Sequence, residues 1–145
     1  MRYVATVSVA GRLPDVFDYL ARFSSAADWD PGVAEAKQGT ADPVALGTKF
    51  DLVAVFLGNR VPMTYEIVEY ERPNRVVLLA ETATARSLDT ITFAKVDDSR
   101  TAVTYDAILD FKGIARLAAP LLSLAFRKTG DRAAAGLASC RPPRN

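Results

Sequence analysis

The middle of the chain constrains the fold most, because it consists of short alternating segments separated by tight turns. From Val33 to Asp110, runs rich in β-branched and aromatic residues alternate apolar and polar side chains, which predicts strands. Turn residues separate these runs, as at Gly58-Asn59 and at 72–75. No connection is long enough for a parallel crossover. We therefore predict six antiparallel strands here, with a two-residue type II′ turn at Gly58-Asn59.

The segment before this region predicts one more strand and two helices. Arg2 to Val9 alternates with a period of two, like the central strands. Pro14 suits the first position of a helix, and apolar residues then recur at helical spacing as far as Phe23. A second, short helix is predicted to end at Trp29, before the turn Asp30-Pro31-Gly32.

The segment after the strands predicts a long C-terminal helix. Apolar residues recur at helical spacing from Ile114, and the helix is expected to end before Arg141. Pro120 lies inside this pattern and predicts a kink, because proline removes a backbone donor and clashes with the preceding turn. The second half is rich in glycine and alanine, which either allow close approach of another backbone or leave space beside the helix.

Together these elements predict a single α+β domain over residues 1–145. A seven-stranded antiparallel sheet wraps around the long C-terminal helix, and two short helices follow the first strand. The sheet has one apolar face that needs cover, and only the long helix is large enough to supply it. A strongly twisted sheet around one helix encloses more volume than the helix fills. This architecture therefore predicts an internal cavity.

Composition excludes several classes of chemistry. The 145 residues include no histidine, which removes Ser-His-Asp triads, Cys-His pairs and imidazole zinc sites. A single cysteine, Cys140, excludes an intrachain disulfide and a Cys-rich metal cluster. We predict neither a metal nor a cofactor. The longest apolar stretch, 114–126, is too short to span a bilayer, and the N-terminus lacks a signal-peptide core. We therefore expect a cytoplasmic protein without integral membrane association.

Charge is unevenly distributed along the chain. Residues 112–145 carry a formal charge of +6, whereas residues 1–111 carry −5. The simplest interpretation is a basic helix on an acidic sheet. Alternatives are a basic rim for an anionic ligand or membrane surface, or a docking surface for a protein partner. Nucleic acid is not a predicted partner, because no dense run of basic residues is interleaved with aromatic ones.

Several local motifs, in their order along the chain, resemble a known family. They are Leu13 to Leu20, Trp29-Asp30-Pro31-Gly32-Val33, Gly47-Thr48-Lys49-Phe50, Tyr65 to Pro73 and Phe111-Lys112-Gly113. The chain resembles the START-like (SRPBCC) superfamily, specifically its polyketide cyclase/dehydrase family, which shares a helix-grip fold with Bet v 1-like proteins. The resemblance implies that fold. It does not select one function, because these proteins include lipid carriers, hormone binders and aromatase/cyclases.

Strand alternation indicates which side chains face the cavity. The inward residues of the strands are expected to be Phe50, Leu52, Phe56, Met63, Tyr65, Ile67, Ser87, Asp89, Ile91, Phe93, Tyr105, Ala107 and Leu109. The long helix is expected to oppose them with Leu117, Leu121 and Leu122, and Trp29 either anchors the short helix or flanks the cavity entrance. The same side chains would form an ordinary packed core if the cavity were closed.

The polar residues of this set are the most informative. Inward Tyr65 and Tyr105 each need a hydrogen-bond partner in the protein, in a ligand or in water. Asp89 is expected to pair with Arg86, to lie at the cavity mouth, or to have a raised pKa suited to acid–base chemistry. Asp89 and Tyr105 are accordingly the candidate catalytic residues.

The sequence therefore predicts a binding protein for a hydrophobic or amphipathic small molecule, such as a lipid, a polyketide or an aromatic metabolite. The alternative is a cyclase or dehydratase that acts on a polyketide-like substrate through tyrosine and aspartate acid–base groups. A monomer or a homodimer is expected.

Overall fold

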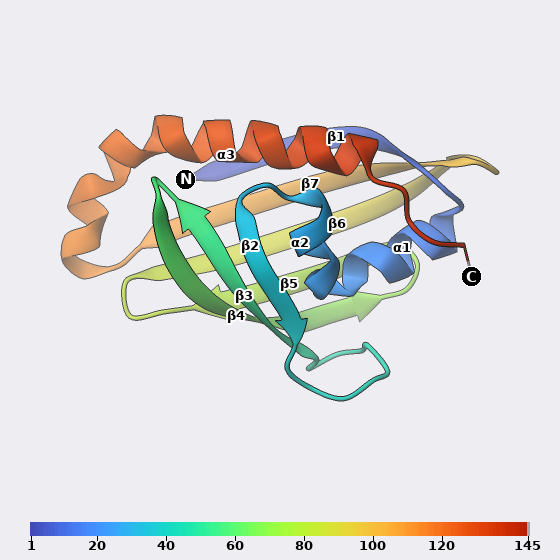
Figure 1. Cartoon of the computed structure of the whole chain (residues 1–145), viewed down its shortest axis with the longest axis horizontal. Coiled ribbons are helices and arrows are strands. Elements are labelled where there is room, and N and C mark those ends of the chain that lie inside the picture. The colour runs from blue at the N-terminus through green and yellow to red at the C-terminus, as the bar shows by residue number, and fades with distance from the viewer. Residues whose placement is uncertain (145) are drawn as a thin grey trace.

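The computed structural model describes residues 1–144, which contain one sheet of seven antiparallel strands (Figure 1). The strand order is β1-β7-β6-β5-β4-β3-β2, so the six later strands form a meander and β1 pairs with β7. The strands are β1 Arg2–Ala10, β2 Val33–Gln38, β3 Lys49–Phe56, β4 Asn59–Glu71, β5 Arg75–Glu81, β6 Ala85–Asp97 and β7 Arg100–Phe111. The predicted α+β class and sheet are confirmed.

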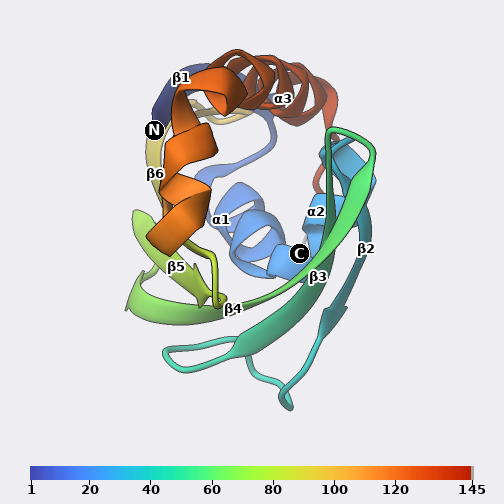
Figure 2. The same cartoon turned by 90° about the vertical axis from the view of Figure 1, so that its left-hand side faces the viewer.

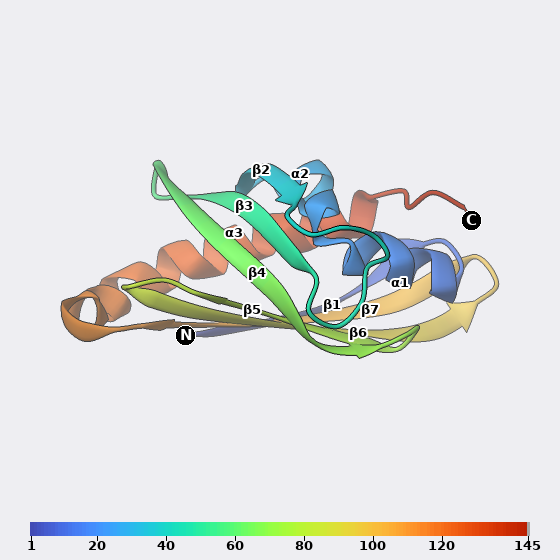
Figure 3. The same cartoon turned by 90° about the horizontal axis from the view of Figure 1, so that it is seen from below.

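The sheet is strongly twisted, so its two edges point in different directions. Figure 3 shows β2 and β3 crossing steeply over the direction of β6 and β7. This curvature follows from the right-handed twist of each strand. It creates the concave face on which all of the helices lie.

The β3–β4 hairpin differs from the prediction by one residue. Phe56 pairs with Asn59, so the central turn residues are Leu57 and Gly58. Both have positive φ, 51° for Leu57 and 78° for Gly58, which is the signature of a type I′ turn. The predicted type II′ turn at Gly58-Asn59 was wrong, because glycine occupies the second central position and Asn59 is already part of β4.

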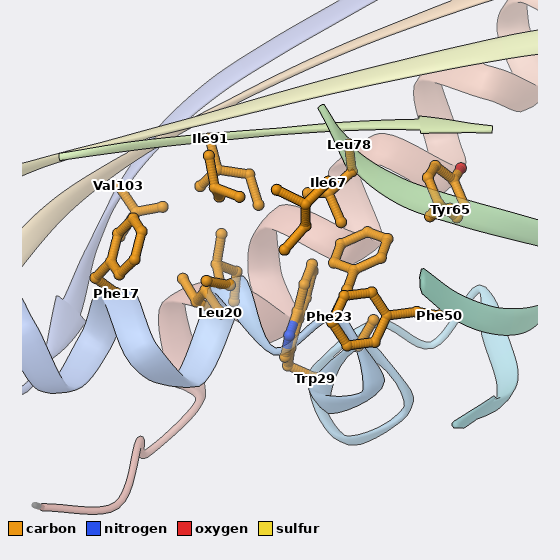
Figure 4. Packing of buried hydrophobic residues seen from close by; sticks show 14 of the residues in the cluster. Phe17, Leu20, Phe23, Trp29, Phe50, Tyr65, Ile67, Leu78, Ile91 and Val103 are labelled. Carbon is orange, nitrogen blue, oxygen red and sulfur yellow. The ribbon is translucent and has the colours of Figure 1, made fainter. Parts of the chain in front are cut away.

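The helices after β1 close one end of the concave face. They are α1 Leu13–Ala21, a 3₁₀ turn at Phe23–Ser25 and α2 Ala26–Trp29. Phe17 of α1 packs edge-on against Phe93 and Tyr70, with ring centroids 5.0 and 5.5 Å apart. Figure 4 shows the buried side chains that α1 and the sheet share at this end. The core of the protein is therefore concentrated under α1.

The long C-terminal helix is present, but it begins differently from the prediction. Residues Gly113–Ala118 form a 3₁₀ helix, and the α-helix α3 spans Ala119–Ser139. Pro120 therefore lies in the first turn of α3 and not inside a continuous helix, a position where the missing N–H is tolerated. Figure 2 shows that the chain changes direction between the two parts.

Two glycines allow α3 to lie close to the rest of the fold. A Cβ atom at Gly136 would lie 1.8 Å from the carbonyl oxygen of Trp29. One at Gly130 would lie 2.6 Å from the ring of Tyr3. The predicted role of small residues in this half of the helix is confirmed, since α3 is in direct backbone contact with α2.

Candidate functional site

A cavity of about 280 Å³ lies between the sheet and α3, at the end that α1 leaves uncovered. Its wall includes side chains of β1, β3, β4, β6, β7 and α3. Lining residues such as Ser87 and Leu137 are buried, whereas Val61 and Thr84 are exposed. The cavity therefore has a closed floor and a mouth bordered by β4 and the β5–β6 loop.

Ten of the predicted cavity residues do line the cavity. They are Trp29, Leu52, Phe56, Met63, Tyr65, Ser87, Asp89, Tyr105, Ala107 and Leu109. Most of their side chains are apolar. The polar side chains among the strand residues come from β4, β6 and β7, because alternation places every second residue of each strand on the concave face.

Four predicted lining residues belong to the packed core instead. Phe50, Ile67, Ile91 and Phe93 are at most 4% exposed and are not part of the cavity wall. They are on the correct face of their strands but closer to α1 and the 3₁₀ turn that follows it. Figure 4 shows Ile67 and Ile91 on the side of the sheet that Leu20 faces, and Phe50 beside Phe23. Alternation of side chains shows which face of the sheet a residue is on. The helix packed on that face determines which of these residues form the core and which line the cavity.

The three predicted leucines of the C-terminal helix do not line the cavity. Leu117 and Leu121 are 80% and 85% exposed, and Leu122 is half-buried outside the cavity wall. The helical phase read from Ile114 is not kept, because a 3₁₀ helix has three residues per turn and α3 starts afresh at Ala119. The residues of α3 that line the cavity come later in the helix: Phe126, Thr129, Gly130, Ala133, Ala134 and Leu137.

The prediction also missed residues from β1 and from the turn after α2. Tyr3, Ala5 and Val7 line the cavity because β1 pairs with β7 at the edge of the sheet. Their alternation is visible in the sequence and could have identified them. Asp30 lines the cavity as well, although its turn-forming context suggested only a helix stop.

The polar atoms of the cavity form a hydrogen-bonded chain across the sheet. The Tyr65 hydroxyl lies 2.9 Å from Ser87 Oγ, which donates to Asp89 Oδ1 at 3.2 Å. The Tyr105 hydroxyl donates to Asp89 Oδ2. Since the Ser87 proton is used toward Asp89, Tyr65 is the donor in its contact with Ser87. The three hydroxyls thus all direct hydrogen bonds toward one carboxylate.

Strand register explains how Tyr65 reaches Ser87 although β5 lies between them. Tyr65 pairs with Ala80 of β5, and Ala80 pairs with Ser87 of β6. A methyl group at position 80 leaves room above the sheet for the phenol ring to reach across. The small central residue is therefore what connects β4 to the polar groups of β6.

Burial controls the electrostatics of this chain. It raises the pKa of Asp89 from 3.8 to about 6, although the hydrogen bonds from Tyr105 and Ser87 act in the opposite direction. Burial also raises the pKa of Tyr65 and of Tyr105. The expected pair between Asp89 and Arg86 is absent, because Arg86 contacts Glu81 at 3.7 Å on the surface. Asp89 is therefore hydrogen-bonded to hydroxyl groups and not paired with a cation. With its pKa near 6, its carboxyl group can exchange a proton near neutral pH.

Asp30 and Trp29 complete the wall beside α3. Asp30 Oδ1 accepts a hydrogen bond of 2.8 Å from the Gly32 N–H, and burial raises the pKa of Asp30. The Trp29 ring packs edge-on against the Tyr105 ring at 5.9 Å, and its Nε1–H donates to Ser25 Oγ at 3.3 Å. Trp29 is thus both a packing anchor and part of the cavity wall, and it supports the ring of Tyr105.

Residues 1–144 contain no group of three or more histidine, cysteine, aspartate or glutamate side chains arranged to hold a metal ion. None of the helices in the same part of the chain is long and apolar enough to cross a membrane.

Comparison with solved structures identifies the fold. A START superfamily protein from Mycobacterium smegmatis superposes with a TM-score of 0.77 at 11% sequence identity, over 94% of each chain. The Zhui aromatase/cyclase from Streptomyces sp. R1128 superposes with a TM-score of 0.74 at 12% identity, over 95% of this chain and 91% of that one. At such low identity these similarities establish the fold alone. No protein of curated function is significantly similar to this chain in sequence.

The sequence profile of one family covers nearly the whole chain. Residues 1–139 match the family described as polyketide cyclase/dehydrase and lipid transport. The seven-stranded curled sheet with a long C-terminal helix is the helix-grip arrangement that the resemblance in sequence implied. The chain therefore belongs to the polyketide cyclase/dehydrase and lipid-transport family.

Proposed function

We propose that this protein binds a hydrophobic or amphipathic small molecule in the cavity between the sheet and α3. The observation that carries the proposal is the cavity itself, which stays open although a core is packed beside it. Its volume of about 280 Å³ is close to the lower end for small-molecule sites, so one small ligand fits. Apolar walls such as Leu52 and Leu109 supply affinity, and the hydroxyls and carboxylates orient polar groups of the ligand.

A titration with N-phenyl-1-naphthylamine, a neutral fluorescent probe of apolar cavities, tests this proposal. Ala133→Leu places a larger side chain in the cavity wall, whereas Ala138→Leu places the same side chain on the exposed face of the same helix. We expect Ala133→Leu to weaken binding by about tenfold or more and Ala138→Leu to leave it unchanged. Equal binding by both variants and the unmodified protein would show that the probe does not use the cavity.

The second candidate function is an enzyme that moves protons on a polyketide-like substrate. The observation in its favour is that Asp89, with a pKa of about 6, and the Tyr105 hydroxyl share a hydrogen bond in the cavity wall. A carboxylate of that pKa serves as a general base near neutral pH, and a tyrosine hydroxyl stabilises a developing enolate. The structurally similar Zhui protein is an aromatase/cyclase, which agrees with such chemistry.

Proton exchange on a model β-diketone tests this second candidate. We expect the protein to accelerate deuterium exchange at the central carbon of benzoylacetone, as followed by NMR. The variants Asp89→Asn and Tyr105→Phe should slow exchange by about a hundredfold or more, which is the usual contribution of a general acid–base group. Asp110→Asn, on the outer face of β7, is the control and should have no effect. Exchange that Asp89→Asn does not alter would eliminate the acid–base role.

A further inference from the structure

The charged groups of the cavity have one sign. Among the lining side chains of residues 1–144, Asp30 and Asp89 are carboxylates and no lysine or arginine is present. The basic side chains Lys128 and Arg132 of α3 line a second pocket, which shares Gly32, Val55 and Thr129 with the cavity wall. The basic C-terminal segment thus does not provide a positive charge to the cavity wall.

Within residues 1–144, the hydrogen-bond partners of these two carboxylates are neutral. Asp89 accepts from the hydroxyls of Ser87 and Tyr105, and Asp30 accepts from the backbone N–H of Gly32. Both carboxylates line the same cavity, and the pKa of Asp89 is raised mainly by burial and further by the negative charge of Asp30. A buried charge is costly unless an opposite charge accompanies it, and at neutral pH the cavity holds negative charge without such a partner.

From this arrangement we infer that the cavity selects a ligand with a protonated amine on an apolar body, and rejects carboxylates and phosphates. The inference rests on the proposed function, because it names the chemical class of the molecule that the cavity takes. An ammonium group supplies the missing positive charge and donates hydrogen bonds to the carboxylates. An anionic headgroup would add a third negative charge to the same low-dielectric space.

Three probes with one shape test this inference. We propose calorimetric titrations with 2-naphthylmethylamine, 2-naphthalenemethanol and 2-naphthoic acid at near-neutral pH and physiological ionic strength. The amine is expected to bind about tenfold tighter than the alcohol, and the acid at least about tenfold more weakly than the alcohol. Equal affinities, or tighter binding of the acid, would overturn the inference while leaving the cavity a binding site.

Matched variants connect the preference to the carboxylates. Asp89→Asn keeps the size of the side chain and should reduce the amine-to-alcohol affinity ratio to within about threefold of unity, with little change for the alcohol. Asp30→Asn should reduce the same ratio and provides the test if Asp89→Asn fails to fold. Asp110→Asn removes an exposed carboxylate from the outer face of β7 and should leave the ratio unchanged.

The outcomes separate the inference from the proposed function. A ratio that both cavity variants leave intact would overturn the inference, because the preference would then come from elsewhere. Absence of binding by all three compounds would overturn the proposed function and this inference with it, whereas binding of the alcohol alone would overturn only the inference.

Discussion

Gly136 is the residue whose substitution tests the packing of α3 most sharply. A Cβ atom at this position would lie 1.8 Å from the carbonyl oxygen of Trp29 and 3.0 Å from its carbonyl carbon. Both are backbone atoms, so no rotamer change relieves the contact. In Gly136→Ala, α3 must therefore move away from α2 by roughly 1 Å or more, because protein interiors are close-packed.

Two effects of opposite sign determine the change in stability. Alanine favours a helix over glycine by about 1 kcal/mol. Forcing extra volume into a packed contact costs about 1–3 kcal/mol or more. The displaced helix also carries Leu137, which is 1% exposed and whose partial loss of burial adds to the cost. We expect Gly136→Ala to lower the free energy of unfolding by about 1–3 kcal/mol.

Chemical denaturation measures this effect, and exposed Ala138 provides the control. Ala138→Gly reports helix propensity in the same turn without any contact and should cost up to about 1 kcal/mol. If propensity alone mattered, Gly136→Ala would stabilise the protein by a similar amount. A stabilised or unchanged Gly136→Ala variant would therefore refute the close contact between α3 and Trp29.

Three further predictions concern the helix, the buried carboxylate and the strand between Tyr65 and Ser87. Leu137→Ala should cost about 2–5 kcal/mol of unfolding free energy, whereas Leu121→Ala, at an exposed position, should change it by less than about 0.5 kcal/mol; similar values in denaturation would contradict the orientation of α3. Asp89 binds its proton more tightly in the folded state, with a pKa of about 6 against the ordinary 3.8, so its contribution to stability is complete below about pH 4 and is lost as pH rises through 6. That loss amounts to at most about 3 kcal/mol, and a similar pH dependence in Asp89→Asn would assign it to other groups. Ala80→Val should separate the Tyr65 and Ser87 hydroxyls and destabilise the protein by about 1–3 kcal/mol, and an unchanged hydroxyl proton signal of Tyr65 in NMR spectra would argue against the register.

The fold was predictable because its signals are local and repeated. Seven segments alternate apolar and polar side chains, and the connections between the central six are too short for parallel crossovers. These two signals together indicate an antiparallel meander. The inward face was correct for most strands for the same reason. The β3–β4 turn was shifted by one residue because Leu57 adopts a positive φ, which is uncommon for a residue with a side chain.

The division of the concave face into core and cavity was not predictable from alternation. Phe50 and Leu52 are on the same face of β3 and both are buried in the core, yet only Leu52 also lines the cavity. The difference depends on where α1 and the 3₁₀ turn after it lie along the strands, which is a tertiary property. The orientation of Leu117 was missed because Pro120 interrupts the helical phase, so periodicity before the proline does not extend beyond it.

The candidate polar residues were found because a polar side chain on an otherwise apolar strand face needs a partner and therefore attracts attention. Asp89 and Tyr105 were identified by alternation alone, and they are in hydrogen-bond contact. The partner proposed for Asp89 was wrong because Arg86 lies three residues before Asp89 on β6, and this odd separation points its side chain to the opposite face of the sheet. Asp30 was missed because the sequence Asp30-Pro31-Gly32 indicated only a turn. Its side chain accepts a hydrogen bond from Gly32 in that turn and also lines the cavity.

The central claim is that the space between the sheet and α3 holds a ligand. The most direct measurement is a titration of the isotope-labelled protein with N-phenyl-1-naphthylamine, followed residue by residue in NMR spectra. Our account predicts saturable one-to-one binding, with the largest shifts at cavity residues such as Ser87, Ala107 and Ala133 and little change at Val16, a buried residue of α1. Shifts confined to the exposed leucines Leu117 and Leu121, or no saturable binding at all, would contradict it.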